Sequence, residues 1–361
     1  MDITMNKLNV AIIGQGRSGK NIHGKFFRSN LNSFYNVKYV VDLDEHRRKV
    51  AEEIYEGCQT FADYRDLFSL CDIDLVVNAT FSDTHYSITK EFLLRGYNVI
   101  VEKPFARTRY ECDELISIAK REGVLLEVFQ QSLHAEYYRF AKTVADSGKL
   151  GDIKQVCVRF NGFSRRWDWQ TLQKKCAGGL YNTGPHPIGF ALGFLDFDEN
   201  ARVAYSKLDT ALTSGDGDDF AKVIITAPGK PLVDVEVISC DAYCDYNIKV
   251  IGSKGTLKCT PTKYNMTYIV DGENPERPLI EEFLKDENGE PIYCSERLAK
   301  HTEEGVIEDT GFSNAPMEIY KDIYYAITEG APLRVTPEMG AKTIEIIESV
   351  HANNPLPLKF I

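Results

Sequence analysis

The segment LNVAIIGQGRSG, residues 8–19, constrains the fold of this chain more than any other stretch. An apolar run typical of a buried strand passes directly into three glycines with the spacing G-x-G-x-x-G. Such glycines allow a tight turn between a strand and a helix, and they let the backbone approach a pyrophosphate closely. The alternative is a surface turn that is merely rich in glycine. The expected cofactor contacts in this turn are Gly14, Gly16, Arg17, Ser18 and Gly19.

Strand-like and helix-like segments alternate through the first third of the chain. The strand-like runs are short and apolar, and each is followed by a segment with helical periodicity. This alternation indicates an α/β domain of the Rossmann type, with a doubly wound parallel sheet, over residues 1–130. The expected strands are 8–14, 37–42, 72–80, 98–104 and 124–129, and the expected helices are 16–30, 45–55, 83–96 and 109–123.

After residue 130, strand-like runs follow one another without intervening helices. This order indicates an antiparallel or mixed sheet, so we assign residues 131–361 to an α+β domain with a mostly antiparallel open sheet. The segment 271–315, rich in Glu, Asn, Gly and Pro, is expected to be irregular. The expected strands are 155–163, 201–210, 221–227, 232–240 and 247–260, and the expected helices are 136–148, 317–330 and 338–353.

Composition narrows the choice of partners and of compartment. The net charge of −11 disfavours nucleic acid, whose binding depends on clustered Lys and Arg. No stretch approaches the roughly 20 apolar residues that span a bilayer. The nine cysteines lack a C-x-x-C pair, which indicates reduced thiols and no metal site. The run 8–14 is expected to be a strand and not a signal peptide, so a cytoplasmic protein acting on a small molecule is expected.

A carboxylate at the end of the second expected strand bears on the choice of cofactor. Asp42 stands where an acidic side chain hydrogen-bonds the ribose diol of a dinucleotide. The same charge repels the 2′-phosphate of NADP, so NAD is the expected cofactor. Arg47 and Arg48 lie close by in the sequence and weaken this preference.

Two further segments carry candidate catalytic side chains. Glu102-Lys103-Pro104 lies at the carboxyl end of an expected strand, the edge where open α/β sheets bind ligands. A lysine there can stabilise the alkoxide of a hydroxyl that loses its proton, although a solvated lysine is an equal alternative. His186 lies between two prolines in GGLYNTGPHPIGFALGFL, residues 178–195. Without further context, His186 is more typical of a buried structural histidine.

Together these motifs resemble the Gfo/Idh/MocA oxidoreductase family, named for glucose-fructose oxidoreductase and inositol dehydrogenase. The resemblance rests on the glycine loop, on E-K-P and on a glycine pair followed by G-x-H. Thr80 and His85 resemble the family's T-P-x-x-x-H stretch, with Phe81 in place of proline, and the segments 251–257 and 330–340 also fit. The resemblance implies a Rossmann domain joined to a mostly antiparallel sheet that often makes oligomer contacts, so a homo-oligomer is expected.

The resemblance also implies residue roles. Lys103 and His186 correspond to the family's catalytic lysine and histidine. Asn182 stands where the family commonly has Asp, and an amide can orient a ring but cannot raise its basicity by charge. Further expected cofactor contacts are Asp42, Thr80, His85, Glu102, Lys103 and Gln131. Expected substrate contacts are Lys103, Asn182 and His186. Arg166, Trp167 and Asp168 are further candidates, because a Trp beside Arg and Asp suits a sugar ring, although an ordinary interdomain loop is an equal alternative. The histidines expected to be structural or solvated are His23, His46, His134, His301 and His351.

The combined interpretation is an NAD-dependent dehydrogenase. It oxidises a secondary hydroxyl of a sugar, glycoside or cyclic polyol to a ketone, with the C3 hydroxyl of a sugar as the specific case. His186, expected to ionise at about pH 6 to 7.5, accepts the hydroxyl proton. One alternative is an oxidation that starts glycosidic cleavage by elimination. Another is an NAD-bound regulator without turnover, which Asn182 favours and the presence of both Lys103 and His186 disfavours.

Overall fold

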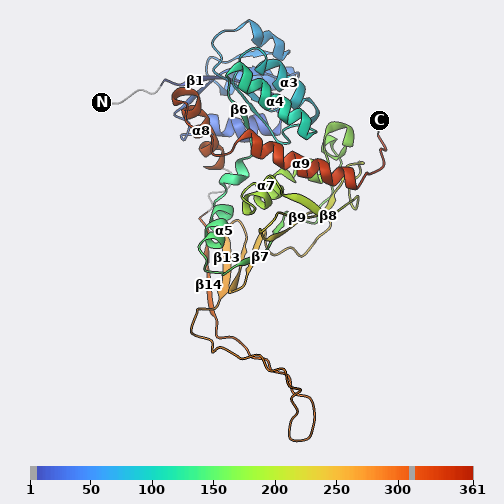
Figure 1. The fold of residues 1–361 in the computed structure, drawn as a ribbon. Coiled ribbons are helices and arrows are strands. Elements are labelled where there is room, and N and C mark those ends of the chain that lie inside the picture. Colours follow the sequence, from blue (N-terminus) through green and yellow to red (C-terminus); the bar gives the residue numbers. More distant parts are fainter. Residues whose placement is uncertain (1–5, 309–313, 361) are drawn as a thin grey trace, which may run out of the picture.

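A computed structural model describes residues 6–308 and 314–360 (Figure 1). Residues 1–5, 309–313 and 361 lie outside this description, and with them the ends of the expected domains and part of the expected irregular segment. Within the described residues the strands form two sheets, one of six strands and one of eight. Figure 1 shows helix α9 (Pro337–Asn353) running between the two halves of the molecule.

The N-terminal sheet is parallel, with the strand order β3-β2-β1-β4-β5-β6. The order reverses between β1 and β4, and sheets of this kind bind ligands at the carboxyl ends of the strands beside that point. The doubly wound Rossmann sheet is therefore confirmed. The prediction missed β3, which is too short to show a period. The strands are β1 (Leu8–Ile13), β2 (Tyr35–Val41), β3 (Gln59–Phe61), β4 (Leu75–Asn78), β5 (Val99–Val101) and β6 (Leu126–Val128).

Helices whose ends are encoded in the sequence pack on this sheet. The side chain of Asp44 caps α2 by accepting hydrogen bonds from two backbone N–H groups of the first turn. Thr108 and Glu111 form a reciprocal capping box on α4, and Gly123 ends that helix with a φ of 69°. These caps satisfy backbone groups that the helix itself leaves unpaired. The helices are α2 (Glu45–Ile54), α3 (His85–Leu93) and α4 (Arg109–Glu122).

The helix after the glycine loop differs from its prediction. The sequence predicts one helix over 16–30, but the chain forms a π-turn over Gly19–His23 and then a short α1 (Gly24–Phe27). The N–H of Gly24 donates to the carbonyl of Gly19, so the turn holds one residue more than an α-helical turn. Its last residue, His23, is fully buried.

The C-terminal sheet has the order β14-β13-β12-β11-β7-β10-β9-β8. Strands β7 and β10 run parallel, and the other neighbours are antiparallel, which confirms the mostly antiparallel sheet. The strands are β7 (Ile153–Arg159), β8 (Arg202–Asp209), β9 (Phe220–Thr226), β10 (Leu232–Ile238), β11 (Ile248–Gly252), β12 (Gly255–Cys259), β13 (Lys263–Tyr268) and β14 (His301–Val306). The accompanying helices are α5 (Glu136–Asp146), α6 (Gly179–Asn182) and α7 (Pro185–Phe194).

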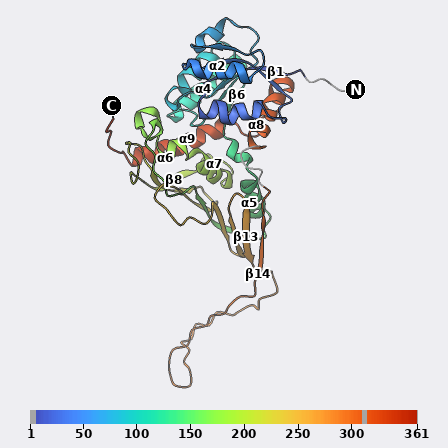
Figure 2. The same cartoon turned by 180° about the vertical axis from the view of Figure 1, so that it is seen from behind.

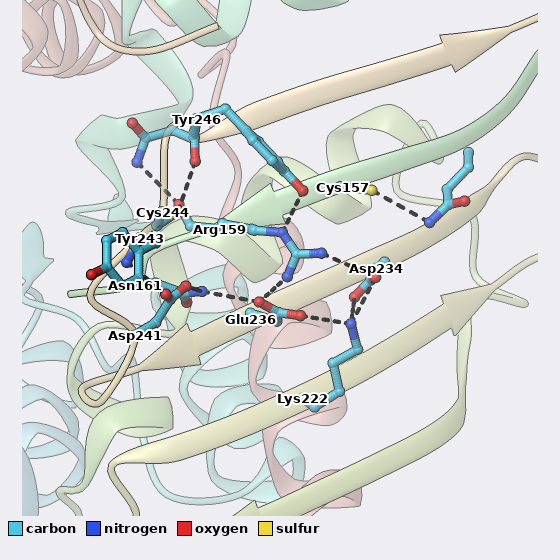
Figure 3. Close-up of polar contacts among 12 residues, drawn as sticks. Cys157, Arg159, Asn161, Lys222, Asp234, Glu236, Asp241, Tyr243, Cys244 and Tyr246 are labelled. Carbon is cyan, nitrogen blue, oxygen red and sulfur yellow. Dashed lines mark hydrogen bonds and ion pairs between the residues drawn. The ribbon is translucent and has the colours of Figure 1, made fainter. Parts of the chain in front are cut away.

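The two faces of this sheet differ in chemistry. One face is apolar: Val156 and Val235 are fully buried, and α7 packs against their strands. The opposite face carries charged side chains that pair within the chain (Figure 3). There Arg159 binds Glu236, and Lys222 Nζ lies 2.7 Å from Glu236 Oε1. The alternation of strand side chains thus separates a hydrophobic core from a polar surface.

The expected irregular segment 271–315 contains a strand. Strand β14 pairs with β13, with Thr302 opposite Thr267, so the prediction is wrong for residues 301–306. Residues 301–306 are polar and lack the alternation typical of a strand, so their extended conformation depends on pairing with the neighbouring strand. Between β13 and β14 the chain forms a long arm that reaches away from the body (Figures 1 and 2). Its exposed large apolar side chains are Val270, Leu279, Ile280, Phe283, Ile292, Tyr293 and Leu298.

Of the two C-terminal helices, one lies between the two halves of the molecule and the other packs on the N-terminal half. The predicted start of α9 is confirmed, because Thr336 caps it and Pro337 is its first residue. Helix α9 contacts α4 and β6 on one side and α7 and β8 on the other. Helix α8 (Asn314–Glu329) buries Ile319 and Tyr320 in a cluster with Val10 of β1. The end of the chain thus completes the core of the N-terminal sheet.

Three further observations concern residues 6–308 and 314–360. No helix there combines the length and the apolar character needed to cross a membrane. His, Cys, Asp and Glu side chains of the same residues form no group of three that could hold a metal ion. The nine cysteines occur as free thiols.

Candidate active site

The glycine loop after β1 has the geometry that a dinucleotide requires. Gly14 has a φ of 92°, and a Cβ there would lie 2.5 Å from the carbonyl oxygen of Ala79. A Cβ at Gly19 would overlap the carbonyl oxygen of Gly14. Around Gly16, by contrast, no atom of the described residues lies within 4 Å of a Cβ position, apart from its chain neighbours. Gly14 and Gly19 are thus required because a side chain at either position would clash with a neighbouring backbone carbonyl. Gly16 instead leaves open the surface that a pyrophosphate would approach.

Two buried amides, one in the glycine loop and one after β6, support the same assignment. In the described part of the chain, Gln15 Nε2 and Gln131 Oε1 are buried without a hydrogen-bond partner. Buried polar groups are nearly always paired, so these atoms indicate places that a ligand would complete. The Asp42 carboxylate accepts the N–H groups of Gln15 at 2.7 Å and Asp44 at 2.9 Å, and Arg47 lies 3.6 Å away. These residues fit a dinucleotide.

The other expected cofactor residues take varied positions. Arg17 is exposed and Ser18 is partly exposed in the turn after the glycines. His85 is buried, and its ring nitrogens lie 2.7 Å from the carbonyl oxygen of Pro104 and 3.3 Å from that of Thr80. Burial lowers the pKa of His85, so its ring is neutral at pH 7. His85 therefore joins the loops that follow β4 and β5.

Lys103 reaches from the Rossmann sheet to the second domain. Its Nζ donates a hydrogen bond of 2.9 Å to the carbonyl oxygen of Asn182, the last residue of α6. In a continuous helix, this carbonyl would accept the N–H of His186. Pro185, which has no N–H, starts a new helix, and the N–H of His186 donates to the carbonyl of Thr183 at 3.1 Å. The break between α6 and α7 thus frees the carbonyl that binds Lys103.

A loop of the second domain holds the Asn182 side chain. Asn182 Oδ1 accepts a hydrogen bond of 3.0 Å from Gln170 Nε2. The same loop carries the expected substrate residues: Arg166 Nε lies 3.1 Å from Asp168 Oδ2, and Trp167 is 75% exposed. The structure therefore brings Arg166 and Asp168 together beside Gln170, while Trp167 projects into solvent.

Burial controls the ionisation of the central pair. His186 is 9% exposed, and its ring lies 6.3 Å from that of Phe160 in a nearly parallel stack. Burial and the charge of Lys103 lower the pKa of His186 to about 3, with Glu102 opposing the shift. Burial therefore argues against the expected ordinary histidine ionisation, because the ring is removed from water. Burial likewise lowers the pKa of Lys103, which Glu102 opposes and Arg166 reinforces.

The sequence predicts no functional role for two residues of this region, His23 and Gln170. His23 is expected to be structural or solvated; its ring is buried and lies 3.2 Å from the carboxylate of Glu102, an expected cofactor contact that is also buried. The spacing of His23 from the glycines was its one signal, and the π-turn that buries it cannot be read from periodicity. Gln170 lies two residues after Asp168 in the polar loop, which was its signal.

Two family descriptions match the chain. Residues 8–130 match "Oxidoreductase family, NAD-binding Rossmann fold", and residues 138–258 match "GFO/IDH/MocA C-terminal domain". The chain belongs to the Gfo/Idh/MocA family of oxidoreductases. The resemblance carried by the glycine loop, E-K-P and G-x-H is thereby confirmed, together with an NAD-binding Rossmann domain.

Relatives in this family differ in their named activities. An inositol 2-dehydrogenase of Salmonella paratyphi B is 24% identical over 250 residues, 69% of this chain and 72% of the relative. A 2,7-anhydro-N-acetylneuraminate hydratase of Mediterraneibacter gnavus is 24% identical over 296 residues, 80% of this chain and 77% of the relative. The solved structure of GenD2 from gentamicin A biosynthesis, in complex with NAD, is 20% identical, with a TM-score of 0.76 over 97% of this chain and 94% of that one. This last likeness shows a shared fold.

Proposed function

We propose that this protein is an NAD-dependent dehydrogenase that oxidises a secondary hydroxyl of a sugar, glycoside or cyclic polyol to a ketone. The C3 hydroxyl of a sugar ring is the specific case to test first. The observation that carries the proposal is the contact of Lys103 Nζ with the helix break between Asn182 and His186. This contact places the Lys103 side chain at the carbonyl of Asn182, four residues before His186, and the charge of Lys103 contributes to the low pKa of the His186 ring. The inositol 2-dehydrogenase relative supports a polyhydroxylated substrate.

In this proposal each polar side chain has one task. His186 accepts the hydroxyl proton with a ring that is neutral near pH 7; because a pKa of about 3 also makes this ring a weak base, the transfer depends on Lys103 stabilising the alkoxide. Lys103 stabilises the negative charge that develops on the oxygen. Asn182, held by Gln170, orients its neighbours without titrating. NAD, when bound, supplies the acceptor for the hydride.

A substrate panel tests the proposal. Purified protein and NAD are mixed with myo-inositol, scyllo-inositol, glucose, glucuronate and alkyl glucosides, and NADH formation is followed by absorbance. We expect turnover with at least one member, slowed by deuterium at the oxidised carbon. Absence of NADH formation, and of NADH consumption with the matching ketones, would contradict a dehydrogenase if NAD still binds.

Two alternatives have distinct readouts. If oxidation starts a glycosidic cleavage, an alkyl glucoside releases its alcohol without net NADH, and the hydratase relative favours including anhydro sugars in the panel. If the protein is an NAD-bound regulator, calorimetry shows tight NAD binding with no turnover of any compound. The departure at Asn182 is the feature that favours this second alternative.

We expect NAD(H) to bind at least about tenfold more tightly than NADP(H), which corresponds to about 1.4 kcal/mol. The Asp42 carboxylate, fixed by two backbone N–H groups, repels a 2′-phosphate, and Arg47 is already close to that carboxylate. Calorimetric titration of both cofactors measures the ratio, and Asp42→Ser narrows it. Asp63→Ser, which removes the cap of a different turn, serves as the control. Equal or tighter NADP binding by the unaltered protein would show that Asp42 does not select the cofactor.

We propose that the protein is a homo-oligomer and that the arm between β13 and β14 contributes to assembly. Phe283 and Tyr293 on the arm are 75% and 87% exposed, and large apolar side chains gain from burial in an interface. Light scattering of the paired variant Phe283→Asp and Tyr293→Asp is expected to give a lower mass than the wild type. Tyr110→Asp, at an equally exposed residue of α4, is the control and keeps the wild-type mass. A monomeric wild-type protein contradicts the proposal.

We propose a cytoplasmic location from the thiol chemistry. Cys71 and Cys294 are exposed free thiols, which oxidising compartments disfavour. Titration of the thiols in protein purified under native conditions is expected to count all nine cysteines as reduced. Disulfide-linked cysteines would argue against this location.

A further inference from the structure

Three buried side chains form a chain of contacts that leads from the glycine loop to Lys103. His23 ends the π-turn, Glu102 follows β5 and Tyr320 belongs to α8, and they are 0%, 4% and 0% exposed. His23 Nδ1 lies 2.7 Å from Tyr320 Oη, and His23 Nε2 lies 3.2 Å from Glu102 Oε1. Glu102 Oε2 accepts the backbone N–H of Lys103 at 3.1 Å. Three distant segments of the sequence therefore converge on the Glu102 carboxylate.

The hydrogens in this chain of contacts have a consistent arrangement. Burial opposes ionisation of Glu102, but the hydrogen bond and attraction of His23, with the charge of Lys103, lower the pKa of the carboxyl to about 2. Because a carboxylate is an acceptor, His23 Nε2 carries a hydrogen in either protonation state of the ring. Tyr320 Oη satisfies the other ring nitrogen. The ring is also packed against Phe129, with centroids 4.2 Å apart, so its orientation is fixed.

A buried ammonium needs a negative charge close by. Burial lowers the pKa of Lys103, and the charges of Arg166 and Arg17 lower it further, whereas Glu102 raises it. If Glu102 turned away or took up a proton, Lys103 would be left in a desolvated place where the charges of Arg166 and Arg17 oppose its ammonium. Its amine would then lose its proton more readily and could no longer stabilise an oxyanion by charge.

We propose that His23 and Tyr320 are positioning residues that hold the ionised Glu102 carboxylate beside Lys103, so that Lys103 remains an ammonium. They act through Glu102 and not by contact with the reacting atoms. The π-turn belongs to this arrangement, because His23 is its last residue and is fully buried. What the ammonium does rests on the proposed function, but its charge can be measured without any turnover.

The reactivity of the Lys103 amine provides that measurement. The full chain is labelled with trace acetic anhydride over a pH series, and labelling at Lys103 and at the exposed Lys120 is quantified by mass spectrometry. Each profile is normalised to its high-pH plateau, so that differences in access cancel. His23→Met removes the donor to Glu102, and we expect normalised labelling of Lys103 at neutral pH to rise about three- to tenfold. Tyr320→Phe raises it less.

Two variants separate positioning from packing. His23→Gln retains an N–H that can reach Glu102 and is expected to restore slow labelling. Tyr35→Phe is the matched control, because Tyr35 belongs to the same aromatic cluster but its Oη donates to the backbone carbonyl of Tyr320, at 2.6 Å. Labelling of Lys120 stays unchanged throughout.

The proposal is overturned if folded His23→Met labels Lys103 as the wild type does, or if Tyr35→Phe raises labelling as much as Tyr320→Phe. Circular dichroism establishes which variants are folded. If His23→Met does not fold, the comparison of Tyr320→Phe with Tyr35→Phe decides the outcome. A substrate panel without turnover leaves these labelling profiles unaffected, so the two proposals fail separately.

Discussion

Lys103→Ala is expected to lower turnover by about two to four orders of magnitude while NAD affinity changes little. The ammonium supplies charge where an oxyanion develops, and the burial that lowers its pKa also strengthens its electrostatic effect. Its hydrogen bond to the carbonyl of Asn182 places it at the second domain. Steady-state kinetics with the best substrate of the panel measure the loss, and calorimetry with NAD confirms that the cofactor site is intact.

The matched control for this variant is Lys175→Ala. Lys175 also connects the two domains, since its Nζ lies 2.8 Å from Asp83 Oδ2, but its partner is a carboxylate and not the carbonyl of Asn182. We expect Lys175→Ala to retain most of the turnover, because an exposed ion pair contributes little. Equal losses in the two variants would mean that Lys103 acts by joining the domains and not by its charge at the reacting oxygen.

The sequence predicts the Rossmann half of the fold well, because its determinants are local. Gly14 and Gly19 are required by contacts within a few residues of themselves or with the adjacent strand, and strand–helix alternation reports the parallel sheet directly. Ligands of such sheets gather at the carboxyl ends of strands, so topology alone makes Lys103 a candidate site residue. Helix caps such as Thr108 are equally local.

The substrate side depends on contacts that a sequence pattern does not contain. Pro185 signals a possible helix start, but that the break frees the Asn182 carbonyl for Lys103 follows from a contact between residues 79 positions apart. The depressed pKa of His186 arises from packing in α7 and from the charge of Lys103. The strand β14 forms through pairing with β13, and its own residues show no apolar alternation.

His186→Ala is likewise expected to lower turnover by about two to four orders of magnitude, because it removes the group that accepts the hydroxyl proton. NAD affinity is expected to stay close to that of the wild type. His186→Gln keeps hydrogen-bonding atoms and most of the buried volume, so a similar loss in both variants separates proton transfer from packing. Near-normal turnover in either variant, on the substrate that the wild type prefers, would identify His186 as a structural residue.

The pH dependence of kcat/KM for alcohol oxidation distinguishes this buried histidine from an ordinary one. A pKa lowered to about 3 means that the His186 ring is already neutral above about pH 4, so the proton acceptor is available at every higher pH. Burial also lowers the pKa of Lys103, so the ammonium is lost below the usual lysine range and activity falls on the alkaline side. We therefore expect a plateau from about pH 5 through neutrality, followed by an alkaline decline. A pH series of kcat/KM with deuterated and unlabelled substrate measures this profile, and the isotope effect verifies that hydride transfer is being observed. An acid limb near about pH 6.5, present in the wild type and absent from His186→Gln, would show that the ring titrates as an exposed histidine when the enzyme works.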